Sequence, residues 1–293
     1  MDLNKSIRFI RKDVVLLYEK MFPLYLITGE KNFLIDCSIS PYSEKIVKNV
    51  KKILNESSLT GVLLTHSHYD HTGACPMISS QLKPKIFGSP RTVELLQKKK
   101  VLKYIENLNR EFEDLLGIGP NLKFSGFNTL KSVKEGDKIS VEKDKYFQVF
   151  ETPGHTKCSL SYLLEPYGVL FPGDAAGVIE RRGKIKPLFL SNFSSYLISL
   201  KKLIKLKAEI LALPHNRFIS GKDNVKTFLS KSLEQSERIG HLIQKEISSG
   251  KNLKTIAKNI LADEFAEPTV QGPKKAFTIN LNAMVNAVKK EMN

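Results

Sequence analysis

Five of the six histidines and two aspartates lie in short segments that follow apolar runs. The densest group is residues 65–71, with the sequence THSHYDH, and His155, Asp174 and His215 stand after three further runs. Neutral imidazole and carboxylate are ligands that zinc prefers and that iron and manganese also accept. These residue types, without a thiolate among them, predict a catalytic metal site.

The spacing within residues 65–71 predicts two metal positions. Alternate residues of an extended turn point to the same side, so His66 and His68 can chelate one ion. Asp70 and His71 then turn toward a second position. Two ions about 3.5–4 Å apart activate a shared water near neutral pH, so no serine or cysteine nucleophile is required.

Four apolar runs of strand length position these candidates: residues 62–64, 146–150, 169–171 and 210–213. Each run leads into candidate ligands, and glycine or proline residues nearby mark the end of the strand. If the strands share a sheet direction, all candidate ligands lie on loops at one rim, where α/β sheets place their sites. Separation along the sequence then does not keep the candidates apart.

The N-terminal third shows further strand and helix patterns. Residues 14–18, 24–27 and 33–35 have the pattern of a β-meander, and residues 43–54 repeat apolar side chains at helical spacing after the capping residue Ser43. The chain is therefore predicted to be of the α/β class.

A helical insertion is predicted at residues 90–117, close to the first metal motif. Ser89 is a typical N-cap, Pro90 suits the first helical position, and Gly117 ends the segment. The insertion is expected to help wall a substrate cleft, and its apolar stripe either packs on the sandwich, which is the favoured alternative, or forms a lid suited to an acyl chain or an aromatic acid. The stripe comprises Leu96, Ile105, Leu108 and Phe112.

A helical C-terminal subdomain is predicted at residues 222–293, after a first domain at 1–221. Strand signals stop near Gly221, and residues 224–249, 253–261 and 277–288 keep helical spacing. The helices are expected to complete the wall of the cleft. The turn that begins at Gly250 suggests a winged-helix-like arrangement.

Composition indicates a folded cytoplasmic protein without a membrane span. The three cysteines show no C-x-x-C spacing, which favours a reducing compartment over a disulfide framework, and no apolar run is long enough for a signal core or a span. The net charge is +16, yet only eight of the 46 basic residues are arginine. Scattered lysine is more typical of a solvated surface than of nucleic-acid recognition.

Residues 65–73, THSHYDHTG, resemble the T-H-x-H-x-D-H-x-G signature of the metallo-β-lactamase superfamily. The later elements at 154–156, 173–174 and 214–215 follow in the family's order, so the resemblance covers about residues 10–220. It implies an αβ/βα sandwich with a dinuclear metal centre, here with a helical C-terminal extension.

The resemblance also implies a role for each candidate ligand. One ion would be held by His66, His68 and His155, the other by Asp70, His71 and His215, and Asp174 would bridge the two. The ions would be divalent, with zinc preferred over iron or manganese. Asp36 resembles the family's structural aspartate beneath the site and is not counted as a ligand.

The resemblance points to hydrolysis of a thioester or lactone through a metal-bridging hydroxide, with Asp70 also able to hold the proton of the nucleophile. Asp174 stands where zinc β-lactamases use cysteine or serine, and His68 stands where flavodiiron proteins use glutamate. Both branches are therefore disfavoured. The glyoxalase II-like thioesterases and lactonases remain as the best match.

Two other classes stay open. A metal-dependent phosphodiesterase or nuclease would use the same ligands and would account for the positive charge, of which half lies in residues 201–293. A ligand-sensing protein on the same fold would account for the C-terminal helices. We expect a small-molecule acyl substrate as the partner, disfavour nucleic acid, and leave a homodimer open.

Overall fold

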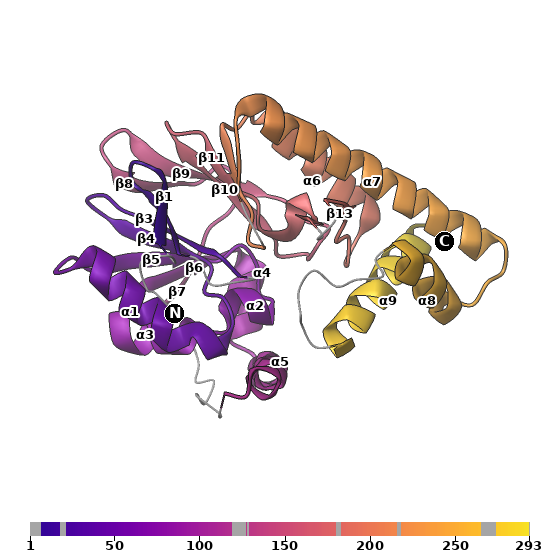
Figure 1. The fold of residues 1–293 in the computed structure, drawn as a ribbon, viewed down its shortest axis with the longest axis horizontal. Coiled ribbons are helices and arrows are strands. Elements are labelled where there is room, and N and C mark those ends of the chain that lie inside the picture. The colour runs from indigo at the N-terminus through magenta and orange to yellow at the C-terminus, as the bar shows by residue number, and fades with distance from the viewer. Residues whose placement is uncertain are drawn as a thin grey trace.

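The computed structural model describes residues 7–17, 22–118, 127, 129–179, 183–215, 218–264 and 274–292. Two β-sheets face each other, and helices cover the outer face of each (Figure 1). This is the αβ/βα sandwich that the sequence predicts, with helices added at the C-terminal end.

The first sheet has seven strands in the order β1 to β7. Strands β2 to β4 form the predicted antiparallel meander, β1 adds an antiparallel strand that was not predicted, and β4 to β7 run parallel to one another. The bounds are β1 Ile7–Arg11, β2 Val14–Leu17, β3 Leu24–Ile27, β4 Asn32–Ile35, β5 Leu59–Leu63, β6 Lys85–Gly88 and β7 Leu130–Ser132.

The second sheet has six strands in the order β15, β14, β11, β10, β9, β8, and β11 pairs parallel to β14. A small separate ribbon joins β12 Val178–Ile179 to β13 Ile185–Lys186. The bounds of the six strands are β8 Lys138–Glu142, β9 Lys145–Glu151, β10 Leu160–Glu165, β11 Val169–Phe171, β14 Ile210–Ala212 and β15 Phe218–Ser220.

Helices form two groups, one on the side of each sheet, and the last two helices of the second group pack on other helices. The first group, with the 3-10 turn η2 Ser40–Tyr42, lies on the first sheet and comprises α1 Ser43–Leu54, α2 Tyr69–Thr72, α3 Cys75–Leu82, α4 Pro90–Leu96 and α5 Lys99–Leu116. The second group, with the 3-10 turn η3 Gly173–Ala176, comprises α6 Phe193–Lys205, α7 Lys222–Ser248, α8 Leu253–Glu264 and α9 Lys274–Met292. No described helix is both long enough and apolar enough to cross a membrane.

Apolar residues form one layer between the sheets and one beneath each set of helices. Phe33 of the first sheet and Phe147 of the second meet between the sheets with ring centroids 5.6 Å apart. Val50 and Ile78 pack from α1 and α3 onto the first sheet, and Leu200 packs from α6 onto the second. Each sheet is therefore packed between the other sheet and its own helices.

The helical insertion differs from its prediction in one respect. Ser89 caps the start as expected, since its hydroxyl accepts from the Thr92 amide, but the predicted single helix is divided into α4 and α5 where Lys98 adopts an extended backbone. The apolar stripe is buried, with each side chain at most 4% exposed. The stripe therefore packs in the core, which is the alternative favoured from the sequence over a lid for an acyl group.

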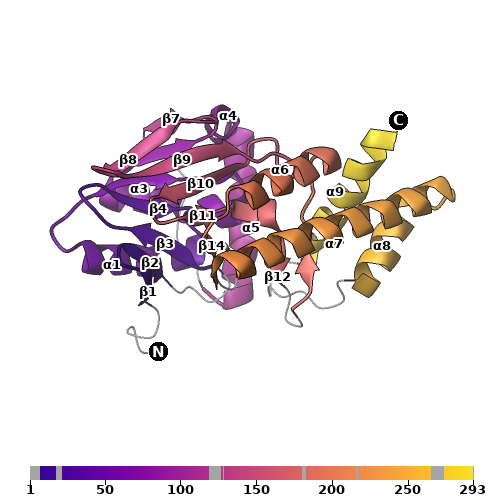
Figure 2. The ribbon, with the colours of Figure 1, turned by 90° about the horizontal axis from the view of Figure 1, so that it is seen from above.

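The C-terminal helices share a core with the second sheet. Val225 and Leu229 of α7 belong to the same apolar cluster as Leu163 and Leu211 of the sheet, and α6 and α7 lie side by side (Figure 2). Gly221 immediately precedes α7, at the predicted boundary. The parts of the chain described after Gly221 contain only helices, so no strand there forms the wing of a winged-helix module.

We expect the shared core to make α7 essential for stability. Leu229 is 1% exposed, so Leu229→Ala should lower the free energy of unfolding by about 2–5 kcal/mol through lost burial and a cavity. Urea denaturation measures the change. Ser230→Ala, at the neighbouring exposed position, is the matched control and should have little effect; equal costs for the two variants would contradict a shared core.

Candidate metal centre

The seven candidate ligands lie in segments that follow strands at one rim of the sandwich, some on loops and some in short helical turns. His66 and His68 follow β5, and His71 lies in α2. His155 follows β9, whereas Asp174 lies in η3 directly after β11. Asp70 of α2 and His215, which follows β14, complete the set. Both sheets therefore contribute to one site.

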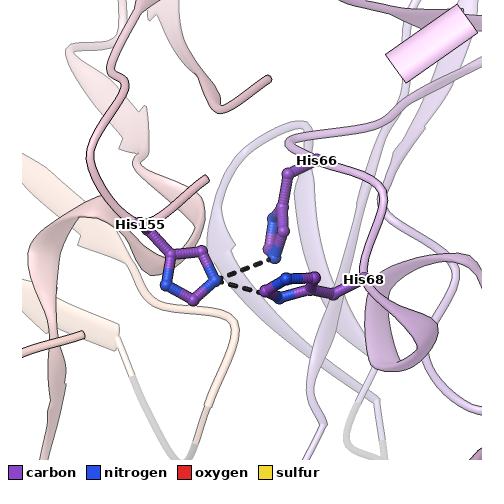
Figure 3. A group of neighbouring side chains, drawn as sticks. All are labelled: His66, His68 and His155. Atoms are coloured by element: carbon purple, nitrogen blue, oxygen red, sulfur yellow. Dashed lines mark hydrogen bonds between the residues drawn. The ribbon is translucent and has the colours of Figure 1, made fainter. Parts of the chain in front are cut away.

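Three histidines form the first cluster, drawn in Figure 3. Nε2 of His155 lies 3.2 Å from Nε2 of His66 and 3.0 Å from Nδ1 of His68. His66 and His155 are buried, and His68 is partly buried. Three ring nitrogens thus converge on one point, as they would around a single ion.

Neighbouring groups determine which ring nitrogen carries the proton in His155 and in His66. Nδ1 of His155 lies 2.8 Å from the carbonyl oxygen of Leu188, which can only accept, so Nδ1 donates and Nε2 keeps its lone pair. Nδ1 of His66 lies 3.0 Å from Oγ1 of Thr65, whose own hydroxyl donates to Asp36. Nε2 of His66 is therefore also left with a lone pair toward the cluster.

Asp70, His71 and His215 form the second cluster, and Asp174 lies between the two clusters. Oδ2 of Asp174 is 3.3 Å from Nε2 of His155, whereas Oδ1 is 3.2 Å from Nε2 of His215 and 3.6 Å from Nε2 of His71. Oδ2 of Asp70 lies 3.8 Å from Nε2 of His215 and 4.0 Å from that of His71. One carboxylate thus faces both clusters with different oxygens.

Asp36 anchors the second cluster from below. Its Oδ2 accepts from Nδ1 of His71 at 2.8 Å, and its Oδ1 accepts from the backbone amide of Thr65 at 2.7 Å. Asp36 has a φ of 57°, a left-handed backbone conformation that few side chains adopt. It holds His71 with Nε2 toward the cluster, as a residue that orients a ligand does.

Burial governs the pKa values of the first cluster. Desolvation lowers the pKa of His68 and of His155 to about 4, against partial compensation by the Asp174 carboxylate. Desolvation together with the nearby rings also lowers the pKa of His66 well below its ordinary value. All three imidazoles are therefore neutral at physiological pH, which is the form that binds a metal.

Carboxylates reverse this effect in the second cluster. Burial alone would lower the pKa of His71, but Asp36, Asp70 and Asp174 together raise it to about 10. Burial would likewise lower the pKa of His215, and Asp174 raises it. The pKa of Asp174 falls well below its ordinary value, because the nearby imidazoles outweigh the effect of burial. The metal-free second cluster thus holds protons where an ion would otherwise supply positive charge.

The donor set fits two divalent cations. Nε2 of His71, Oδ1 of Asp174 and Nδ1 of His215 are buried without a hydrogen-bond partner, which is costly unless another group satisfies them. A cation between the first two of these atoms would do so. The clusters are consistent with the dinuclear metal site of the metallo-β-lactamase fold, and the choice of metal is left open by histidine and carboxylate ligands.

Several residues that shape the site gave no signal in the sequence. Phe22 packs edge-on to His215, with ring centroids 5.4 Å apart, and edge-on to Phe112 of α5 at 5.7 Å. Phe22 also lines a small cavity together with Asp70 and His71. Through this stack α5 contacts the second cluster, although Phe112 itself is buried core.

Comparison with known sequences identifies relatives. The model of the metallo-beta-lactamase superfamily matches residues 24–215, about two thirds of the chain. A metallo-beta-lactamase fold-containing protein of Sulfurisphaera tokodaii is 26% identical over 227 residues, 73% of this chain and 81% of that protein. A hydroxyacylglutathione hydrolase of Buchnera aphidicola is 31% identical over 132 residues, 45% of this chain but only 38% of the enzyme's length.

Solved structures share the fold. A metallo-beta-lactamase family protein from Thermus thermophilus superposes with a TM-score of 0.65 at 16% identity, over 99% of this chain and 95% of that one. An archaeal superfamily protein from Sulfolobus tokodaii gives 0.59 at 19% identity, over 92% and 93%. At these identities the likeness extends to the fold and no further.

We expect the two clusters to respond differently to acid. His68 and His155, with pKa values of about 4, stay unprotonated at neutral and mildly acidic pH, so metal binding to the first cluster should change little between about pH 5.5 and 8. His71, with a pKa of about 10, carries a proton that an ion must displace. The affinity of the second cluster should therefore fall by up to about tenfold for each unit by which the pH is lowered.

Equilibrium dialysis of metal-free protein against Zn²⁺ at several pH values tests this difference. The two binding steps should separate as the pH falls, with the second ion lost first. Identical pH dependence of both steps would contradict the protonation states of the two clusters.

Removal of the charge on Asp36 should weaken the second cluster selectively. In Asp36→Asn, the amide oxygen can still accept from the Thr65 backbone amide, but the side-chain NH2 group faces the protonated Nδ1 of His71 and cannot accept from it. Loss of such an orienting contact typically costs about 10–100-fold in metal affinity. Asp13→Asn is the matched control, because Asp13 pairs with Lys145 away from the clusters. Equal metal affinities for the two variants would argue against the anchoring role.

Proposed function

Because the chain belongs to the metallo-beta-lactamase superfamily, we propose that it is a metal-dependent hydrolase acting on an activated acyl bond, a thioester or a lactone. The observation that carries the proposal is the placement of Asp174, whose two oxygens face the two His-rich clusters. A carboxylate in that position suits a pair of ions. The groups around the clusters favour the acyl class of substrate.

The proposed ligand assignment follows the two clusters. His66, His68 and His155 hold one ion, Asp70, His71 and His215 hold the other, and Asp174 is shared. When bound, two such ions supply a water activated near neutral pH and a Lewis acid for the oxygen of the substrate. Zinc is the proposed metal, with iron and manganese as alternatives, since all three accept histidine and carboxylate.

Asp70 is the proposed residue for proton handling. Its side chain is 14% exposed, whereas those of Asp174 and His71 are 6% and 2% exposed, so Asp70 is the carboxylate of the set that solvent and substrate reach most readily. A carboxylate at that position can accept the proton released by the nucleophile and hold it near the departing group.

A thiolate leaving group suits this site because none of the histidines remains available as a general acid. Five of the six histidines lie in the clusters, and the sixth, His241, is exposed on α7. No imidazole is therefore free to protonate a leaving group, which an alkoxide needs and a thiolate does not. The similarity to hydroxyacylglutathione hydrolases over less than half of their length supports the same substrate class.

The proposed partner is a small acyl compound, and a homodimer is the proposed alternative to a monomer. The cysteines are free thiols in the structure, which supports the proposal of a reducing, cytoplasmic location. Lysines dominate the basic residues, which favours a small-molecule substrate over a nucleic acid.

A substrate panel tests the proposal. With one zinc-loaded preparation, kcat/KM should be highest for acyl thioesters, among them a hydroxyacyl thioester of glutathione, lower for lactones, and lowest for a generic phosphodiester. Asp174→Ala serves as the metal-centre control and should lose activity on all of them. A phosphodiester preference of tenfold or more, about 1.4 kcal/mol in transition-state stabilisation, would favour the nuclease-like alternative.

A further inference from the structure

Two buried thiols lie together where the segment after Asp36 meets the segment after His71. Sγ of Cys37 is 2.8 Å from Sγ of Cys75, and both residues are fully buried. Both are free cysteines, and neither takes part in the metal clusters. Packing alone does not require two sulfur atoms this close, because a small apolar side chain would fill either position.

The two cysteines belong to segments that are already joined by backbone hydrogen bonds. Cys37 follows Asp36 and donates its amide to the carbonyl oxygen of His71 at 2.8 Å. Cys75 begins α3, and the amide of the preceding Ala74 donates to the carbonyl oxygen of Ser38 at 3.3 Å. The main chain on both sides therefore holds the thiols at a fixed short separation.

We propose that Cys37 and Cys75 form a reversible disulfide site that cross-links the Asp36 segment to α3. Each thiol loses its proton, one sulfur–sulfur bond forms, and the two electrons and two protons pass to a disulfide such as glutathione disulfide, which leaves as two thiols. A disulfide bond measures about 2.05 Å, so a small rotation of the two side chains brings the sulfurs from contact to bonding distance.

Cys158 has a different environment and does not compete for the bond. Its Sγ lies 3.2 Å from Oγ1 of Thr156 and 3.5 Å from Oγ of Ser67, so hydroxyl groups rather than a second thiol surround it. The geometry thus specifies one pairing out of the three that the cysteines allow. Cys158 also supplies an internal control within the same chain.

The cross-link would act on the anchor of the second cluster. The disulfide would close a loop of residues 37–75, which contains α1, β5 and the ligands of residues 66–71. The segment that carries Asp36 would then stay attached to the segment that follows His71 during local opening. Closing a loop of this size restricts the unfolded chain, which raises stability. Because both thiols are buried, the reaction proceeds through local opening of the structure and is slow.

The test uses the full-length, metal-loaded protein incubated with glutathione disulfide. Intact mass should fall by about 2 Da, and denaturing alkylation should modify Cys158 alone. Peptide mapping should find a Cys37–Cys75 cross-link that dithiothreitol removes, and the melting temperature of the oxidised protein should be several degrees higher. Cys158→Ser should show the same mass decrease as the wild type, whereas Cys37→Ser and Cys75→Ser should not show it.

Two outcomes would overturn the proposal: an unchanged wild-type mass after prolonged incubation near the melting temperature, or glutathione adducts in place of the internal cross-link. If a serine variant does not fold, the wild-type peptide map decides alone. The result is independent of the substrate, because neither mass nor peptide mapping requires activity.

Discussion

Crowding of seven polar side chains at a buried rim is the constraint on which the rest of the structure depends. Five imidazole rings meet with centroids 4.0–5.7 Å apart, and two carboxylates reach into the same space. Nitrogen lone pairs that face one another repel, and water cannot satisfy them where the atoms are buried. Positive charge placed between them removes both costs, either as bound ions or as protons on His71 and His215.

The two sheets tolerate this crowding because close backbone contacts hold the ligand loops in place. A Cβ at Gly173, where φ is +54°, would lie 2.7 Å from Cβ of Thr65, so only glycine lets the turn that carries Asp174 approach the first motif. Gly154 has a φ of +125°, and a Cβ there would lie 2.3 Å from the main chain of Tyr196. The first contact joins the two sheets at the site, and the second holds the loop of His155 against α6.

Sequence alone predicted the strands of residues 14–35, the four strands that lead into the ligand candidates, and the convergence of these candidates at one rim, because each prediction rests on a local pattern of apolar runs and motifs. It could not supply the partners that come from elsewhere in the chain. Phe22 contacts His215, and the carbonyl oxygen of Leu188 accepts from His155, only because the fold brings these distant residues together. Helical periodicity likewise cannot distinguish an apolar stripe that lines a cleft from one that packs in the core, which is why both roles stayed open for the stripe in residues 90–117 until its burial was seen. The proximity of Cys37 to Cys75, 38 residues apart, had no sequence signal either.

Asp36 makes the two clusters chemically unequal. In the first cluster a neutral hydroxyl and a carbonyl group hold the histidines, so desolvation prevails and the imidazoles stay neutral. In the second, the negative charge of Asp36 lies 2.8 Å from His71 and favours its protonated form. The first cluster is therefore ready for an ion, whereas the second must release a proton. Since Asp174 faces both clusters, an ion at the first cluster would lower the negative potential at His71 and so lower the pKa of that imidazole. The shared carboxylate would thus couple the two binding steps.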